Sequence, residues 1–250
     1  MLREERLHRI IEKLLQNQKV SSTELRQEFQ VSEGTIRRDL NELEEKGLLK
    51  KVHGGAVHRP KAPRIFENRM SYVSDRKAAL VQKALSLIED GQLIVIDGGS
   101  TNWHLIKALP LNLRATIFTN SLPIVQELLH FPEVEIQLLG GKIFKESQVS
   151  IGWEVTREIE LIRPDLCFLG IRGIHPIVGI TTLEKEEAQV KKVMAQVSER
   201  VIVLATKDKL GAVDHYKICD CKEVSRIITE DDVEEEILEE FREKGIAIMQ

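Results

Sequence analysis

Apolar and polar positions in the first sixty residues follow a helical period and then shorten to strand-like runs. The run 21–24, Ser-Ser-Thr-Glu, predicts a capping box that opens a second helix. Ser32 predicts the cap of a third helix, and the runs 48–53 and 56–59 around a Gly-Gly pair predict a hairpin. The first helix is predicted by apolar residues three or four positions apart, at Leu7, Ile10, Ile11, Leu14 and Leu15.

From residue 74 onward, short apolar runs alternate with amphipathic stretches, which predicts an α/β layer fold with a largely parallel sheet. The predicted strands are 93–96, 116–118, 134–139, 166–169, 201–205, 226–228 and 246–249. The predicted helices are 75–89, 102–109, 123–129, 184–197 and 233–244. Prolines 60 and 63 lie among basic and polar residues and indicate a linker. We therefore expect a head at 1–59, a linker at 60–73 and a larger α/β domain at 74–250.

Composition narrows the classes of protein. The chain has 250 residues, 42% of them apolar, and a net charge of −4, which excludes a wholly basic coat protein and an acidic disordered chain. Residues 1–60 carry a charge of +2 and residues 61–250 a charge of −6, so a modestly basic head precedes an acidic body. Three cysteines favour reduced thiols over a disulfide scaffold or a metal site. A charged N-terminus without a long apolar run predicts a cytoplasmic protein with no membrane segment. We also expect no metal or cofactor, because His215 is the only histidine close to Cys219 and Cys221.

The two short helices joined by a turn at 30–32 predict a helix-turn-helix. On the third helix, Ile36, Leu40 and Leu43 share one arc, so the small, hydroxylic, cationic and amide side chains point elsewhere, as in a helix that reads a major groove. The basic hairpin would contact phosphates as a wing. The predicted DNA-contact residues are Ser32, Gly34, Thr35, Arg37, Arg38, Asn41, Lys50, Lys51 and His53, with His58 and Arg59 also on the wing. The alternative is a helical interaction domain with a solvated charged face, which the acids Asp39, Glu42, Glu44 and Glu45 favour.

In the body, the strand 93–96 ends in Asp97-Gly98-Gly99-Ser100-Thr101 and a helix follows. A strand, a small-residue turn and a helix N-terminus form an anion site, because unpaired N–H groups and hydroxyls converge there. The alternative is a tight turn with a capped helix. Other strand ends carry Asn120, Gly141, Gly170 and Lys209, and they should share one cleft if the strands are parallel. Trp103 is interpreted either as a core residue or as a lid over a ligand.

The string Ser32, Thr35-Ile36-Arg37-Arg38-Asp39-Leu40, preceded by Arg6, Ile10 and Leu14, resembles the DeoR-type family of bacterial transcriptional regulators. His53-Gly54-Gly55-Ala56 is similar to the family's wing. In the body, the 97–101 loop, Asp165-x-x-Phe168-x-Gly170-x-x-Gly173 and Glu187-x-x-x-Lys191 are similar to its sensor domain. Thr206-Lys207-Asp208-Lys209 departs from the family's Asp-Ser-Ser-Lys, and Glu230 replaces an aspartate.

The resemblance implies a winged helix-turn-helix followed by a sensor domain similar in fold to ribose-5-phosphate isomerases. Thr35, Arg37 and Arg38 would contact operator DNA, whereas Asp39 would orient an arginine or cap a helix. A phosphorylated sugar or related metabolite would bind in the sensor domain. The implied ligand-binding residues are Asp97, Gly98, Gly99, Ser100, Thr101, Asn120, Gly141, Gly170 and Lys209.

We therefore expect a repressor of a sugar catabolic operon that binds double-stranded operator DNA, forms homo-oligomers and has no catalytic residues. One alternative is a sugar-phosphate isomerase with a fused head, in which Asp97, Asp165 or Glu187 would act as the base. A second alternative is a redox repressor that senses a dinucleotide, although the spacing of the first glycine turn is wrong for one.

Overall fold

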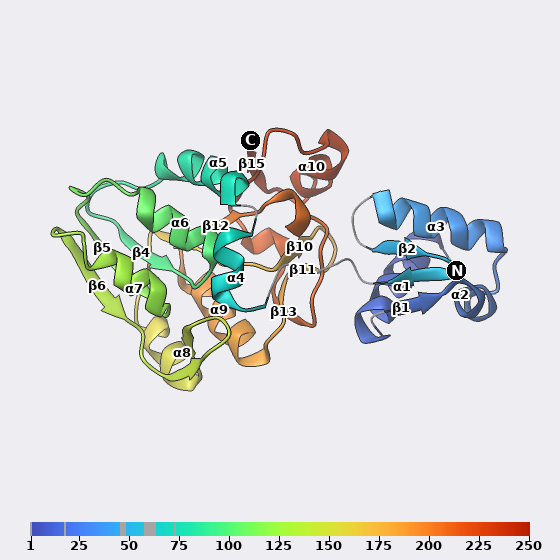
Figure 1. Cartoon of the computed structure of the whole chain (residues 1–250), viewed down its shortest axis with the longest axis horizontal. Helices are drawn as coiled ribbons and strands as arrows, with labels where there is room; N and C mark the ends of the chain where they lie inside the picture. The colour runs from blue at the N-terminus through green and yellow to red at the C-terminus, as the bar shows by residue number, and fades with distance from the viewer. Residues whose placement is uncertain (1, 18, 46–48, 58–63, 73) are drawn as a thin grey trace.

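The computed structural model describes residues 2–17, 19–45, 49–57, 64–72 and 74–250. A small head and a larger sensor domain follow one another along the chain (Figure 1). The head contains three helices and an antiparallel sheet of order β1-β3-β2. Its elements are α1 (Arg3–Asn17), β1 (Lys19–Ser21), α2 (Ser22–Phe29), α3 (Glu33–Glu45), β2 (Lys50–Val52) and β3 (Gly55–Val57).

The caps of the two short helices differ from one another. Ser32 caps α3 as predicted, because its Oγ accepts the Thr35 N–H at 3.1 Å. The capping box predicted at 21–24 is wrong: Ser21 makes no side-chain cap bond, and the Ser22 N–H donates instead to the Gly54 carbonyl at 2.8 Å. Strand β1, which the sequence did not predict, pairs with β3 and brings this helix start beside the hairpin. The predicted wing residues His58 and Arg59 lie outside the described residues.

The sensor domain is built on a seven-stranded sheet of order β15-β14-β12-β9-β4-β5-β6, and every described pairing in it is parallel. All seven predicted strands are confirmed. They are β4 (Leu93–Ile96), β5 (Ala115–Thr119), β6 (Val134–Leu138), β9 (Leu166–Phe168), β12 (Arg200–Leu204), β14 (Arg226–Ile228) and β15 (Ala247–Met249).

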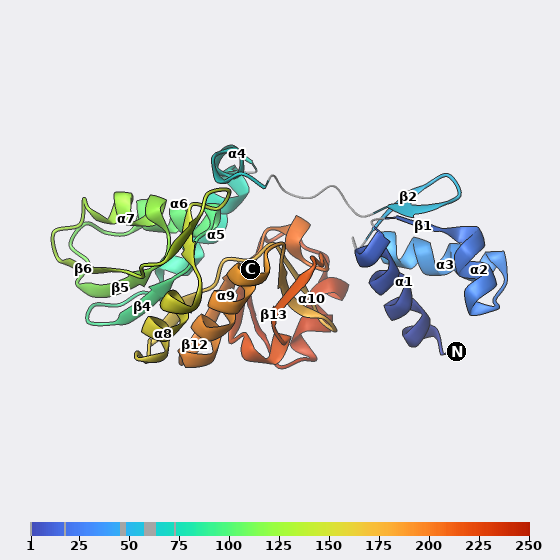
Figure 2. The same ribbon diagram turned by 90° about the horizontal axis from the view of Figure 1, so that it is seen from below.

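Helices cover both faces of this sheet, as Figure 2 shows. Alternate side chains of a strand point to opposite faces, so Ile94 and Ile96 pack with α5, α6 and α7, while Val95 packs with α8, α9 and α10. The face-covering helices are α5 (Ser74–Leu85), α6 (Ser100–Ala108), α7 (Leu122–Leu128), α8 (Trp153–Glu160), α9 (Lys185–Val197) and α10 (Glu235–Arg242). The result is a three-layer core in which the sheet is buried on both sides.

Several elements were not predicted from the sequence. Helix α4 (Phe66–Ser71) lies within the segment predicted as a linker, and the Phe66 side chain is buried. Helix α8 and two antiparallel sheets were also missed. These sheets contain β7 (Lys142–Phe144), β8 (Val149–Ile151), β10 (Gly173–His175), β11 (Gly179–Thr182) and β13 (Tyr216–Cys219), and the short helices η1 (Lys207–Lys209) and η2 (Cys221–Glu223) flank the last of these strands.

Two further features bear on function. In the part of the chain that the structure describes, no helix is both long and apolar enough to cross a membrane. Within the same residues, no group of three or more His, Cys, Asp or Glu side chains could hold a metal ion. All three cysteines are free and buried, and burial raises the pKa of the Cys167 thiol far above its usual range. The cysteines are therefore packed as core residues.

Candidate functional site

The start of helix α3 presents cations to solvent. Arg37 and Arg38 are exposed, as are Ser32 and Gly34, whereas Thr35 is half-buried. Ile36, Leu40 and Leu43 are buried in the head core, which fixes the orientation of the helix. The sequence-predicted arc of apolar residues is therefore confirmed, and the two arginines lie on the opposite side.

Three acids on the same helix have partners within the head. Asp39 is 2% exposed and receives two hydrogen bonds from Arg6, at 2.6 Å and 3.0 Å. This confirms the prediction that Asp39 orients an arginine. Glu42 pairs with Arg3, and Glu44 Oε1 accepts the Lys51 N–H at 2.8 Å. These three carboxylates therefore have partners on other elements, and Asp39 is withdrawn from solvent while Glu44 stays exposed.

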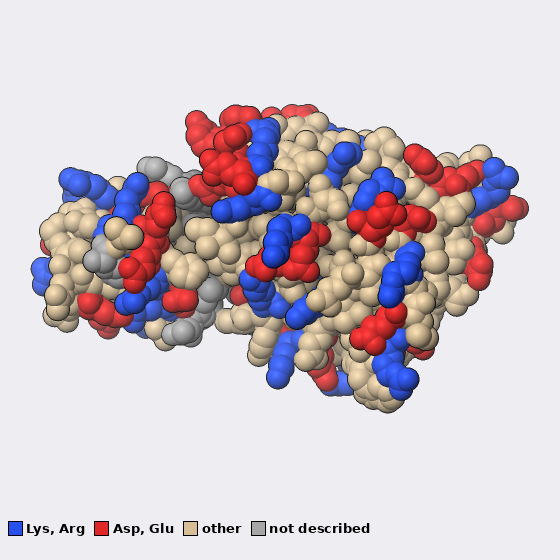
Figure 3. All heavy atoms as spheres, turned by 180° about the vertical axis from the view of Figure 1, so that it is seen from behind, with Lys and Arg blue, Asp and Glu red and all other residues tan. Residues whose placement is uncertain are grey.

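A groove separates α2, α3 and the hairpin. Of the predicted DNA-contact residues, Arg37, Lys51 and His53 line it, and Lys51 Nζ also donates to Asn41 Oδ1. Lys50 is exposed beside it on β2. The sequence analysis did not single out three polar residues of α2 that line the same groove: Ser22 and Thr23 at the start of the helix and Arg26 in its last turn. Figure 3, seen from behind the view of Figure 1, shows positive and negative side chains interspersed over both halves of the molecule.

The sensor domain contains a cavity at the carboxyl ends of β4, β9 and β12. Strand β4 leads through α6 to β5 on one side, whereas β9 pairs with β12 on the other, so the connections diverge between β4 and β9. Ligands bind at such switch points in open α/β sheets. The cavity is lined by Arg69, Tyr72, Lys77, Gly98, Gly99, Ser100, Thr101, Asn102, Leu169, Gly170, Ile171, Arg172, Thr182, Glu187, Lys191, Leu204, Thr206, Asp208 and Lys209.

Two glycine turns meet at the floor of this cavity. A Cβ on Gly170 would collide with the Gly98 carbonyl oxygen and would lie 2.7 Å from Asp97 Oδ2. A Cβ on Gly98 would in turn collide with the Val149 side chain. The turn after β4 can therefore lie against the turn after β9 only without side chains. This close approach leaves the N-terminus of α6, with Ser100 and Thr101, facing the cavity.

Lys191 connects the two turns, because it contacts a residue of each. Its Nζ contacts Asp97 Oδ2, donates to the Gly170 carbonyl at 3.0 Å and lies 3.2 Å from Glu187 Oε1. Burial alone would lower the pKa of Lys191, but the two carboxylates raise it above its ordinary value. Burial raises the pKa of Asp97, although Lys191 beside it acts in the opposite direction. The side chains of this cluster thus serve to fix the cavity floor.

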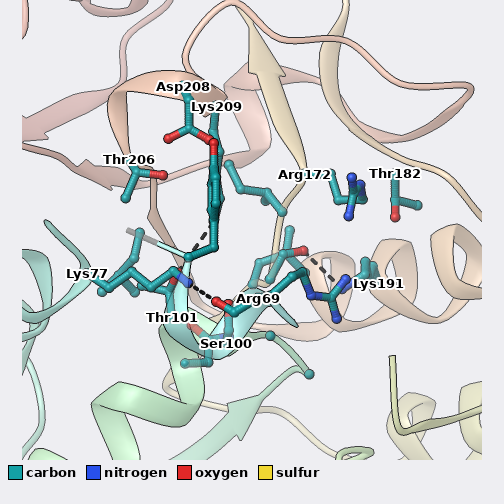
Figure 4. Close-up of a pocket in the computed structure, with 18 of the residues that line it drawn as sticks. Arg69, Lys77, Ser100, Thr101, Arg172, Thr182, Lys191, Thr206, Asp208 and Lys209 are labelled. Atoms are coloured by element: carbon teal, nitrogen blue, oxygen red, sulfur yellow. Dashed lines mark hydrogen bonds between the residues drawn. The ribbon is translucent and has the colours of Figure 1, made fainter. Parts of the chain in front are cut away.

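Four further cations surround the opening, so the lining carries five cationic and two acidic side chains, formally +3. Figure 4 shows Arg69, Lys77, Arg172 and Lys209 around the cavity, together with Lys191. Burial and the neighbouring Arg69 together lower the pKa of Lys77 to about 8, against the opposite effect of Asp208. Burial likewise lowers the pKa of Lys209 to about 8, with nearby Lys77, Arg69 and Arg172 acting in the same direction against Asp208. An anion would relieve the mutual repulsion of these groups.

Polar atoms that lack a hydrogen bond also gather here. Among the described residues, Arg69 Nε, Thr182 Oγ1, Thr206 Oγ1 and Asp208 Oδ1 are buried without a hydrogen-bond partner, although Arg76 lies 3.9 Å from the Asp208 oxygen. Buried polar atoms without partners are costly. One cationic donor, two hydroxyls and one carboxylate oxygen are the groups that would satisfy a phosphoryl group and sugar hydroxyls.

Three predicted ligand residues do not line the cavity. Asp97 is fully buried, and its Oδ2 accepts the Gly170 N–H at 2.8 Å. Asn120 accepts the Gly98 N–H at 3.3 Å and donates to the Ser150 carbonyl at 3.0 Å, so it supports the turn from behind. Gly141 packs against Ile151 and Val155. The other predicted residues, Gly98, Gly99, Ser100, Thr101, Gly170 and Lys209, do line the cavity.

Trp103 packs half-buried against the core cluster under α6, with Lys107 Nζ 4.7 Å from its ring centre. It does not line the cavity, so the core interpretation is confirmed and the lid interpretation is wrong.

The structure also shows where the residues at 206–209, which depart from the family pattern, lie. Lys207 pairs outward with Glu234 at 2.9 Å, while Asp208 lines the cavity. The cavity therefore keeps an acid at this strand end and does not gain a cation from Lys207.

The residues that the sequence reading left out come mainly from segments distant along the chain. Arg69 and Tyr72 come from the predicted linker, Lys77 from the first turn of α5, and Arg172 and Thr182 from the β10–β11 region. The sequence showed that the predicted linker is basic, but it did not show that any of its side chains faces a cavity. Of the candidate bases in the isomerase alternative, Asp165 accepts the Leu93 N–H at the opposite end of the sheet. Asp97 and Glu187 both contact Lys191, and of these two only Glu187 lines the cavity.

Comparison with known proteins gives matches along the chain. A family model described as the DeoR-like helix-turn-helix domain matches residues 6–61, and one described as the DeoR C-terminal sensor domain matches residues 73–231. Among solved structures, ribose 5-phosphate isomerase A from Neisseria gonorrhoeae is similar with a TM-score of 0.40 and 14% identity, over 62% of this chain and 57% of that one.

Curated relatives match over nearly the whole chain. The HTH-type transcriptional regulator GolR of Listeria innocua is 31% identical, over 98% of this chain and 97% of its own length. The HTH-type transcriptional repressor GlcR of Bacillus subtilis is 33% identical, over 92% and 89%. The L-fucose operon activator of Escherichia coli is 27% identical, over 89% and 93%.

Proposed function

Because the chain belongs to the DeoR family of transcriptional regulators, we propose that the cavity of its sensor domain is where a metabolite controls the DNA affinity of the head. The chain is a DNA-binding regulator of carbohydrate metabolism. Its relatives are named as regulators, repressors and an activator, and the isomerase and redox alternatives are not favoured. We assign this chain the role of a repressor without catalytic activity, acting in the cytoplasm.

The effector is a phosphorylated sugar or a closely related metabolite. The single observation that carries this assignment is the cavity lining: cations around the N-terminus of α6, with net formal charge +3, beside unpaired hydroxyls and one carboxylate. The cations and helix N-terminus suit the phosphoryl group. Thr182, Thr206 and Asp208 suit sugar hydroxyls, because a carboxylate accepts from them and the threonines can donate or accept. Ser100, Thr101 and Lys209 complete the phosphate end.

The DNA-contact surface is the start of α3 with the hairpin beside it. Arg37 and Arg38 supply charge, because they are exposed while Asp39 and Glu44 of the same helix bond to Arg6 and Lys51. Ser32, Gly34 and Thr35 would bring the helix N-terminus to the backbone, and Lys50 and His53 would reach phosphates from the wing. In a homo-oligomer, two such helices would lie about 34 Å apart on a nearly palindromic operator.

Fluorescence anisotropy tests the proposal. The intact protein is titrated onto a labelled fragment from upstream of its own operon at fixed salt, with and without inorganic phosphate, phosphorylated sugars and the same sugars without phosphate. We expect sequence-preferring binding that only the phosphorylated sugars change strongly, because only they satisfy both ends of the cavity. Arg37→Ala should weaken binding, whereas Arg9→Ala, which removes an exposed cation from α1, should not. Equal binding to unrelated DNA, or no response to any phosphorylated sugar, would contradict the proposal.

A further inference from the structure

The hydrophobic core of the head includes a side chain from the sensor domain. Val213, in the loop between η1 and β13, is 5% exposed and belongs to the same buried cluster as Ile10, Leu25 and Ile36. Val178, in the β10–β11 loop, packs partly against this cluster. Strands β10, β11 and β13 lie on the side of the sensor domain nearest the head (Figure 1). Val213 and Val178 therefore form a contact surface on which the head packs, and this surface is called the seat below.

The chain around Val213 is fastened to the wall of the cavity. Lys209 lines the cavity, and two residues later the Gly211 N–H donates to the Ile174 carbonyl at 2.7 Å. The Asp214 N–H donates to Thr181 Oγ1 at 2.9 Å. The neighbour of Thr181, Thr182, lines the cavity. The five-residue segment 210–214 is thus held at one end by a residue that faces the ligand site and at the other by β11.

This segment also packs tightly against β10. A Cβ on Gly173 would collide with the Ala212 carbonyl and would lie 2.6 Å from the Ala212 carbonyl carbon. The two backbones are in close contact. A displacement at Asp214 is therefore transmitted along the segment 210–214, because packed interiors shift as units.

An ion pair joins the cavity directly to this segment. Arg172 lines the cavity beside Thr182 (Figure 4), and its Nε lies 3.3 Å from Asp214 Oδ2. The two side chains are 11% and 5% exposed, so the pair is shielded from water. The distance exceeds the roughly 2.7–2.9 Å of strong charge-assisted hydrogen bonds. A tetrahedral dianion in the cavity would therefore compete with Asp214 for the same guanidinium.

We propose that Arg172 and Asp214 are positioning residues that link the occupancy of the cavity to the seat of the head. A dianion draws the Arg172 guanidinium towards the cavity, Asp214 loses this partner, the segment 210–214 loosens, and Val213 no longer holds the head in place. This inference rests on the proposed function, because it assigns the cavity an anionic ligand. Linkage requires the reverse as well: a change that loosens the seat must strengthen anion binding, because part of the cost of loosening has already been met.

The reverse direction gives a sharp test, because Val213 can be altered without touching a residue that lines the cavity. Sulfate is the probe, and its dissociation constant is measured by calorimetry on the full chain. Val213→Thr, which keeps the shape but introduces a hydroxyl, should bind sulfate about fivefold or more tightly than the wild type, within the usual range of such couplings. Asp214→Asn should do the same. Ile177→Thr, at an exposed position of the β10–β11 loop, serves as the control and should leave the constant unchanged.

Hydrogen exchange tests the forward direction in the same proteins. Sulfate should speed exchange of the peptide 210–215 in the wild type. Asp214→Asn should show fast exchange there without sulfate and no further increase with it. Unchanged sulfate affinity in both variants, or sulfate binding with no change in exchange at 210–215, overturns the inference. A wild type that does not bind sulfate refutes the anion assignment instead, and the relay is then decided by whether sulfate-free Asp214→Asn still speeds exchange.

Discussion

Anion binding in the cavity should depend steeply on pH near 8. Lys77 and Lys209 both have a pKa of about 8 before a ligand binds. Each lysine is therefore about nine-tenths charged at pH 7 and about one-tenth charged at pH 9. A dianion binds the charged forms, so its affinity should fall as the pH rises through 8. The sign follows because a bound anion favours protonated lysines and raises their pKa.

The magnitude follows from the same fractions. If one lysine must be charged, the dissociation constant for sulfate should rise about tenfold from pH 7 to pH 9, or about 1.4 kcal/mol. If both are required, the rise approaches about a hundredfold. Sulfate is chosen because it stays a dianion throughout, so any pH dependence comes from the protein. Calorimetry at pH 7, 8 and 9 and constant ionic strength measures the constant. At pH 8, two buffers with different ionisation enthalpies reveal the protons taken up.

Two variants separate the lysines from other causes. Lys209→Arg keeps its charge at pH 9 and should reduce the pH dependence by about tenfold. Lys107→Gln removes an exposed cation from the same helix as Thr101 but outside the cavity, and its pH profile should match the wild type. A sulfate affinity that is constant from pH 7 to 9, with no proton uptake at pH 8, would refute the reasoning and place the lysines away from the anion.

Three further perturbations have definite outcomes. Arg37→Ala should lower the slope of log affinity against log salt by about 0.9 if it neutralises one phosphate, which anisotropy titrations at several salt concentrations measure; an unchanged slope would remove Arg37 from the backbone contacts. Asp39→Asn leaves the charge of Arg6 buried without its ion-pair partner and should destabilise the head by about 3–5 kcal/mol. Urea unfolding measures this loss, and a loss below about 1 kcal/mol would contradict the prediction. Gly170→Ala should destabilise the sensor domain by about 1–3 kcal/mol and abolish sulfate binding, because its Cβ meets the Gly98 carbonyl; a stable, binding variant would show that the turns can separate.

The sequence predicted the main sheet well because its strands are buried on both faces. Continuous apolar runs such as 93–96 and 201–205 arise when helices cover both sides of a parallel sheet. The short antiparallel strands gave no such signal. Strands β10 and β11 have every residue buried within only three or four positions, so neither alternation nor a long run marks them.

The candidate site was predictable where one turn carries it and not where distant segments meet. A strand followed by a small-residue turn and the start of a helix is a recognisable pattern, and it predicted the part of the site at Gly98 to Thr101. Asn120 ends a strand in the same way, yet its amide is consumed by Gly98 and Ser150. A polar residue at a strand end has the same pattern whether it faces a ligand or supports a turn, and only the register of neighbouring chains decides between the two.

Helix α4 has a consequence for how this protein could be recombined. Its Arg69 and the following Tyr72 line the cavity, and Phe66 is anchored by an N–H bond to the Glu146 carbonyl at 2.8 Å. The connection between the halves is thus part of the sensor. A chimaera that exchanges the DNA reader for another must splice before residue 64, since a junction at 73 would transplant the operator preference but delete two walls of the receptor.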